Sequence, residues 1–142
     1  MIKGVNISWN LTKKNIEKVL EKYNFLILSV SPSQETIDET FKLDLIKLES
    51  IINKYIKISP EELSQRIEFI NYVRFSYNKL TKEERKIIYW TYFDKENNYD
   101  DRFIANNLGF SLGYYYIKKK DALIRFAFSL GVEVNDLNKQ SI

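Results

Sequence analysis

The chain has 142 residues and contains no cysteine and no histidine. Without cysteine it can form neither a disulfide nor a thiolate metal site. Without histidine it lacks the usual general base and the commonest zinc ligand. No glycine-rich phosphate loop is present, and no motif places carboxylate, lysine or tyrosine side chains as a catalytic pair. These absences predict a protein that is not an enzyme and that needs no metal or cofactor.

Proline and glycine are scarce, at 2 and 4 residues. Sandwiches and barrels need many turn residues, so this scarcity favours an all-α fold. Long apolar runs are also missing, because the longest uncharged stretch, Tyr23–Gln34, is too short to span a bilayer and no secretory signal precedes it. The sequence therefore predicts a soluble, cytoplasmic protein with no membrane partner.

The chain does have enough apolar side chains for a core, with 44% hydrophobic and 15% aromatic residues. Its charge is nearly balanced, since 22 Lys and Arg residues against 19 Asp and Glu residues leave a formal net charge of +3. A balance this close to neutral does not by itself indicate a nucleic-acid partner. Any such function must follow from where the charged side chains lie.

Apolar residues repeat at helical spacing through the N-terminal half. Residues 12–23 carry one such stripe, and Gln34–Ile56 carries a wider one that must be buried on more than one side. We expect Met1–Asn10 to form a tail that packs on the body. These patterns predict a helical N-terminal lobe over residues 1–78. Its wide stripe either packs within the chain or forms a homodimer interface.

Two helix-start signals follow. Ser59, placed before a proline, predicts the N-cap of a third helix that ends near Asn78. Thr81 and Glu84 have the spacing of a capping box and predict a fourth helix that ends at Phe93.

The polar loop after this helix resembles the start of a calcium-binding loop. Side-chain oxygens alternate there at Asp94, Glu96, Asn98 and Asp100. However, a tyrosine stands where that loop needs glycine, and Ala105 stands where it needs the bidentate glutamate. We therefore predict a plain loop and no metal site.

Residues 79–142 have the pattern of a helix-turn-helix DNA-binding domain. A short predicted helix over 101–108 contains Ala105, a small residue that lets a second helix cross closely. Gly109 follows where the turn can require a positive φ, and Ser111 can cap the next helix.

A helical wheel divides that next helix into two sides. The core-facing side carries Tyr115, Ala122, Leu123, Phe126 and Leu130. In a major groove, the first residues of such a helix reach base edges and longer cations meet phosphate. The side chains that we predict to contact DNA are Arg102, Ser111, Tyr114, Ile117, Lys118, Lys120, Asp121 and Arg125.

These side chains have different expected roles. Tyr114 and Ile117 could contact a thymine methyl group or sugar edges, and Asp121 could accept from the N4 amino group of cytosine. The cations would contact phosphate or guanine. Alternatively, the tyrosines pack and the lysines are simply solvated. Lys119 does not fit the wheel, because it falls on the core-facing side; either it reaches past Tyr115 or the helix is irregular there.

Four segments from Ser59 onward carry a resemblance to a known family. They read L-T-K-E-E-R-K-I-I (80–88), I-A-N-N-L-G-F-S (104–111), Y-Y-Y-I-K-K-K-D-A-L-I-R-F-A (114–127) and L-G-V-E-V (130–134). In these segments the chain resembles the ArpU family of phage-encoded transcriptional regulators. The resemblance implies an activator of phage late genes, for packaging or lysis, in the cytoplasm of a bacterial host.

The resemblance also implies that the C-terminal half is similar to region 4 of sigma factors. In that comparison Ala105, Gly109, Ser111 and Lys118 match the helix-turn-helix pattern. Lys119 departs from it, because sigma-like helices usually place leucine there.

Three functions stay open. The leading one is a sequence-specific DNA-binding regulator whose partner is double-stranded DNA. The second is a sigma-like factor that acts chiefly through RNA polymerase, although residues 1–78 lack the alternating aromatic and basic residues that promoter melting needs. The third is a DNA-binding structural or packaging protein.

Overall fold

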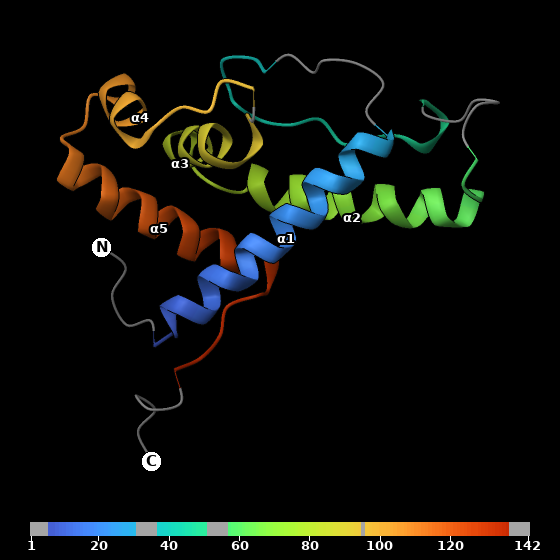
Figure 1. Ribbon diagram of the computed structural model, residues 1–142, viewed down its shortest axis with the longest axis horizontal. Coiled ribbons are helices and arrows are strands. Elements are labelled where there is room, and N and C mark those ends of the chain that lie inside the picture. Colours follow the sequence, from blue (N-terminus) through green and yellow to red (C-terminus); the bar gives the residue numbers. More distant parts are fainter. Residues whose placement is uncertain (1–5, 31–36, 51–56, 95, 137–142) are drawn as a thin grey trace.

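The computed structural model describes residues 6–30, 37–50, 57–94 and 96–136. Within these ranges the chain forms helices and no β-sheet, and one isolated antiparallel bridge pairs Ile7 with Asn135. The prediction of an all-α class is confirmed. In chain order the elements are α1 (Trp9–Val30), η1 (Leu48–Ser50), α2 (Pro60–Asn78), α3 (Lys82–Ile88), η2 (Tyr89–Phe93), α4 (Asp101–Leu108) and α5 (Leu112–Leu130) (Figure 1).

Helix α1 is longer than its apolar stripe predicts. The stripe indicated a helix over residues 12–23, whereas α1 begins at Trp9 and ends at Val30. The described part of the N-terminal tail packs on the body as expected. There the backbone N–H of Ser8 donates to the carbonyl oxygen of Val134 at 2.7 Å.

Side-chain caps fix where α2 and α3 begin. The Oγ of Ser59 accepts the backbone N–H of Glu62 at 3.1 Å, and Pro60 occupies the first turn, where its missing N–H costs nothing. Thr81 and Glu84 form a reciprocal capping box, with donor–acceptor distances of 2.9 and 3.3 Å. Both predicted helix starts are confirmed.

The predicted fourth helix reaches Phe93 in two parts. After α3 the backbone widens into the π-helical η2, in which the N–H of Asp94 donates to the carbonyl oxygen of Tyr89 at 2.8 Å. The ring of Phe93 packs against those of Tyr23 and Tyr77, with centroid distances of 5.0 and 5.2 Å. Through Phe93, this wider turn packs against the hydrophobic core to which α1 and α2 contribute.

The predicted helix over Gln34–Ile56 is wrong across its described middle. Residues 37–47 form a turn and irregular backbone before η1, and the two ends of that range lie outside the described residues. The carboxylate of Asp38 accepts the backbone N–H and the hydroxyl of Thr40, at 2.9 and 2.5 Å. Phe41 then adopts a positive φ of 58°. A right-handed helix cannot continue through that conformation.

Side chains of α2 replace the hydrogen bonds that a helix would have given this segment. Asn78 bonds both backbone groups of Leu43, accepting its N–H at 2.9 Å and donating to its carbonyl oxygen at 2.8 Å. Asn71 does the same for Ile46, at 2.7 and 2.9 Å. Buried backbone polar groups need hydrogen-bond partners, and these two amides supply them outside a helix. The segment can therefore follow a non-helical path although its apolar pattern favours a helix.

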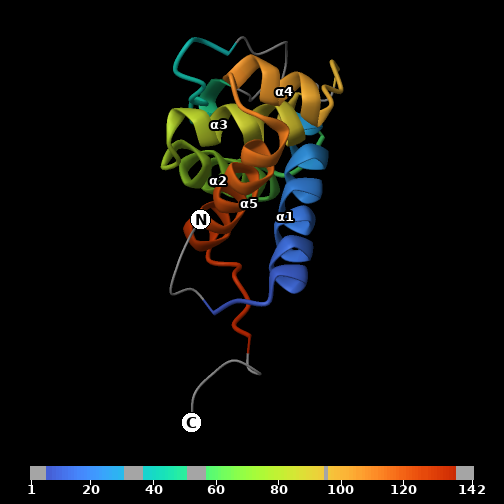
Figure 2. The same ribbon diagram turned by 90° about the vertical axis from the view of Figure 1, so that its left-hand side faces the viewer.

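One hydrophobic core joins α1, α2, α3 and α5. Helix α1 packs against both α2 and α5 (Figure 2). The buried side chains of this core include Ile16, Leu20, Ile70, Val73, Tyr77, Ile88, Phe126 and Leu130. These side chains come both from residues 1–78 and from residues 79–142, so the two ranges share one core. The division of the chain into two domains at residue 78 stays a prediction. Within the described ranges, no helix is long and apolar enough to cross a membrane.

Candidate nucleic-acid interface

A tight turn connects α4 with α5 at one end of the molecule (Figure 1). Gly109 ends α4 with a φ of 73°, a conformation that L side chains rarely adopt. The N–H of Phe110 donates to the carbonyl oxygen of Ala105 at 2.9 Å, as in a glycine-terminated helix end. The Oγ of Ser111 accepts the N–H of Tyr114 at 3.2 Å. The positive φ predicted for Gly109 and the cap predicted for Ser111 are therefore confirmed.

A small apolar cluster holds α4 against α3 and α5. Its buried members are Ile87 from α3, Ile104 and Ala105 from α4, and Tyr115 from α5. Because the side chain of Ala105 is a single methyl group, the backbone of α4 can approach its neighbours closely. Phe110 packs against this cluster from the turn.

A polar contact beside the cluster explains the position of Lys119. Its Nζ lies 3.1 Å from Oδ1 of Asp101 on α4, and the hydroxyl of Tyr115 donates to the same oxygen at 2.9 Å. The Nζ also lies 5.9 Å from the centroid of the Tyr115 ring. Lys119 thus reaches past Tyr115 to a carboxylate, and α5 remains a regular α-helix through this position.

The same contact determines the protonation of Asp101 and Tyr115. Burial acts to raise the pKa of Asp101, but hydrogen bonds from Tyr115 and Lys119 outweigh it and hold that pKa below its ordinary value. Burial and the hydrogen bond to Asp101 raise the pKa of the Tyr115 hydroxyl. At neutral pH Asp101 is therefore a carboxylate that accepts from both side chains and links α4 to α5.

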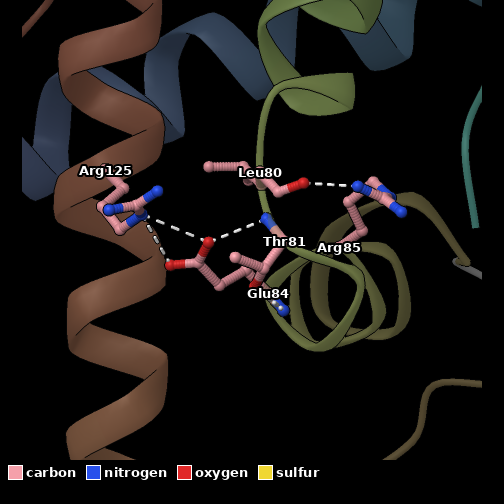
Figure 3. A network of polar contacts seen from close by, with 5 residues as sticks. All are labelled: Leu80, Thr81, Glu84, Arg85 and Arg125. Atoms are coloured by element: carbon pink, nitrogen blue, oxygen red, sulfur yellow. Dashed lines mark hydrogen bonds and ion pairs between the residues drawn. The ribbon is translucent and has the colours of Figure 1, made fainter.

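A second polar contact ties α5 to the start of α3 (Figure 3). The Nε of Arg125 lies 3.2 Å from Oε1 and 3.0 Å from Oε2 of Glu84, whose side chain is 7% exposed. Glu84 also accepts the backbone N–H of Thr81, so one buried carboxylate serves both the cap of α3 and the ion pair. The side chain of Arg125 remains 53% exposed. Sequence spacing could not predict this pair, because its members lie 41 positions apart.

Several of the predicted contact residues gather on the side of α5 that turns away from the core. Tyr114 and Ile117 are 48% and 42% exposed, and the exposed Arg125 follows further along. Lys118 is half-buried, with its Nζ 6.0 Å from the centroid of the Tyr114 ring, and Asp121 is half-buried too. We call Tyr114, Ile117, Lys118, Asp121 and Arg125 the α5 face.

The other predicted residues lie apart from the α5 face. Lys120 is exposed on a different side of the helix, where its Nζ lies 5.3 Å from the ring centroid of Trp9 on α1. Arg102 is exposed on the first turn of α4. Ser111 is exposed, but its hydroxyl oxygen already accepts the capping hydrogen bond.

An aromatic group beside α4 was not predicted from the sequence. The rings of Tyr99 and Phe103 stack with 4.2 Å between their centroids, and Trp90 packs edge-on against them at 6.3 and 6.4 Å. Tyr99 lies before Asp100, the N-cap of α4, so helical spacing gave no signal for this stack. This group fixes the loop that leads into α4.

Comparison of the chain with protein-family models, with curated protein sequences and with solved structures gives no match. The function must therefore be inferred from the geometry of α4, α5 and the α5 face. That geometry consists of two capped helices joined by a tight turn. Exposed tyrosine, isoleucine and basic side chains lie on the outer side of the second helix.

Proposed function

We propose that this protein is a sequence-specific DNA-binding transcriptional regulator in which α5 enters the major groove of double-stranded DNA. Helix α4, the turn and α5 would then form a helix-turn-helix of the sigma region 4 type. The observation that carries the proposal is the α5 face. Tyr114, Ile117 and Lys118 lie in the first two turns of a capped helix, on the side away from the core. A recognition helix contacts bases with this part of its surface.

The cations on and near the α5 face suit the phosphate backbone of DNA. A net charge of +3 gives little long-range attraction, so local cations would have to supply the phosphate contacts. Lys118 and Arg125 lie on the face itself, and Arg102 is exposed at the start of α4. Because Glu84 already holds the Nε of Arg125, less side-chain entropy is lost when the guanidinium meets phosphate.

The resemblance to the ArpU family supports a more specific role, the activation of phage late genes for packaging or lysis in a bacterial host. Three of the four segments that carry it, 80–88, 104–111 and 114–127, overlap α3, α4 and α5. RNA polymerase and a second copy of the chain, paired through the N-terminal helices, are the further partners that go with this role. For a homodimer, α1 offers the exposed side chains of Phe25 and Leu28.

Selection of bound duplexes from a random library, with the purified full-length protein, tests the proposal. We expect enrichment of a defined site and protection of that site from cleavage in the absence of RNA polymerase. A footprint that requires polymerase would favour a sigma-like factor instead. Salt-dependent binding without sequence preference would favour a structural or packaging protein. A protein that binds no duplex contradicts the proposal altogether.

A further inference from the structure

We infer that α5 reads DNA chiefly through the C5 methyl groups of pyrimidines, so that its target is a thymine-containing site in which 5-methylcytosine can replace thymine. This inference rests on the proposed function. In the major groove thymine presents its C5 methyl beside an acceptor oxygen. A methyl group on C5 of cytosine occupies the same place in that groove, so an apolar surface would meet both bases alike.

The polar side chains around the start of α5 are engaged within the protein. The Oγ of Ser111 accepts the N–H of Tyr114 in the cap, and the carboxylate of Asp101 accepts from both Tyr115 and Lys119. These groups are therefore partly occupied before a base approaches: the Oγ of Ser111 keeps only its O–H as a donor, and Oδ1 of Asp101 already accepts twice. Leaving a partly buried polar group without its partner is costly, so these bonds are expected to persist in the complex.

The side chains that remain exposed there are largely apolar. Residues 112–118 contain no Arg, Asn or Gln, the side chains that form bidentate bonds with guanine and adenine most readily. Tyr114 and Ile117 present 48% and 42% of their surface to solvent. The one cation in the segment, Lys118, is half-buried against the Tyr114 ring. The surface therefore suits a methyl group better than a hydrogen-bonding base edge.

Gly113 leaves open space on this surface beside Ile117. It lies one helical turn before Ile117 and so on the same side of α5. A Cβ at Gly113 would meet no atom within 4 Å, so packing inside the protein does not require glycine there. The missing side chain leaves room for a base edge to approach Ile117.

The size of the effect follows from the apolar area involved. Burying one methyl-sized group against the protein corresponds to about fourfold in Kd, the equivalent of ~0.8 kcal/mol. Several thymines contacted together would multiply this factor. Methyl readout can therefore supply selectivity without any bidentate pair.

Removing single methyl groups from the DNA tests the inference. In the duplex enriched by selection, each dT is replaced in turn by dU, which keeps the base pair and loses only the methyl. We expect about fourfold weaker binding at each contacted position. The protein should also bind weakly to a duplex that carries dC paired with dG at such a position. Replacing that dC with 5-methyl-dC should then strengthen binding by about fourfold.

Protein variants show whether α5 makes the contact. For the Ile117→Ala variant, duplexes with dT and with dU should have the same Kd at one or more positions, because the apolar side chain that contacts the methyl group is gone. Phe128→Ala is the matched control. Phe128 is an exposed apolar residue of the same helix, 46% exposed, but lies about three turns further from the reading end. That variant should keep the full difference, and circular dichroism checks that both variants are folded.

The outcomes separate this inference from the proposed function. An enriched site that binds equally well with dT and dU at every position overturns methyl readout and leaves the DNA-binding role intact. An enriched site without thymine overturns it as well. If no site is enriched, both proposals fail.

Discussion

Lys119 on α5 and Asp101 on α4 form an ion pair, with 3.1 Å between Nζ and Oδ1. Sequence spacing places Lys119 on the core-facing side of α5, where a cation is not expected. The pair turns that position into a link between the two helices, and Tyr115 donates to the same carboxylate oxygen. The orientation of α5 relative to α4 therefore depends on a polar contact as well as on apolar packing.

Replacing Asp101 by Asn removes the charge of this pair but leaves an oxygen for Tyr115. We expect the free energy of unfolding at neutral pH to fall by about 0.5–1.5 kcal/mol, since both charged side chains are partly exposed. The folded-state pKa of Asp101 lies below its ordinary value of 3.8. Its carboxylate thus stabilises the fold above that pH, and the contribution is lost as the pH falls through the folded-state pKa.

Urea unfolding of the wild-type and Asp101→Asn proteins over a range of pH measures this contribution. The difference between them should be largest at neutral pH and should shrink below pH 3.8. Tyr115→Phe removes one of the two donors to Asp101 and keeps Lys119, so the pH-dependent difference should become smaller without disappearing. A difference between wild-type and Asp101→Asn that does not change with pH would contradict the ion pair.

The two glycines at the turn should respond oppositely to alanine. Gly109 has a φ of 73°, so Gly109→Ala should lower the free energy of unfolding by about 1–2 kcal/mol. Gly113 lies inside α5 with open space around it, so Gly113→Ala should be neutral or should stabilise by up to about 1 kcal/mol. Thermal unfolding of both variants measures this. Equal losses would mean that Gly109 has no special backbone role.

Glu84 and Arg125 can be examined with a double-mutant cycle. Glu84→Ala should cost about 1–2 kcal/mol, because both the capping box and the ion pair are lost. The coupling energy between the two positions should stay below about 1 kcal/mol, since Arg125 is 53% exposed. Thr81→Ala removes the cap without touching Arg125, and its effect should add to that of Arg125→Ala. A coupling energy of zero between Glu84 and Arg125 would mean that their contact does not stabilise the protein.

Lys118 should contribute one phosphate contact. In that case Lys118→Ala weakens binding to all duplexes and reduces the slope of log K against log salt by about one unit. Lys57, an exposed lysine that precedes α2, provides the control, because Lys57→Ala should leave the slope unchanged. Titrations at several salt concentrations measure both slopes. An unaltered slope for Lys118→Ala would exclude the phosphate contact.

Features with a local cause could be predicted from the sequence. Ser59, Thr81 and Ser111 cap their helices as expected, because a cap depends on residues within one turn. The turn at Gly109 was predictable for the same reason. The expected outer side of α5 also carries exposed side chains, because the 3.6-residue period determines which positions share a side.

Features that depend on distant residues could not be predicted in this way. The apolar pattern of Gln34–Ile56 favoured a helix, yet Asn71 and Asn78 bond the backbone of its described middle in a non-helical path. The partners of Lys119 and Arg125 lie on other helices, so spacing within α5 carries no information about them. Local periodicity determines which side of a helix is buried, whereas the partners of its charged residues depend on the whole fold.

The central claim is that α5 reads bases, and Tyr114→Ala tests it most directly. Tyr114 is 48% exposed and packs edge-on against Phe110, so its loss should leave the fold intact. The measurement is the set of duplexes selected from one random library by the wild-type protein and by this variant. We predict that the variant enriches a changed site, with preference lost at the positions that Tyr114 contacts. Equal loss of affinity for every sequence, with the selected site unchanged, would contradict the claim.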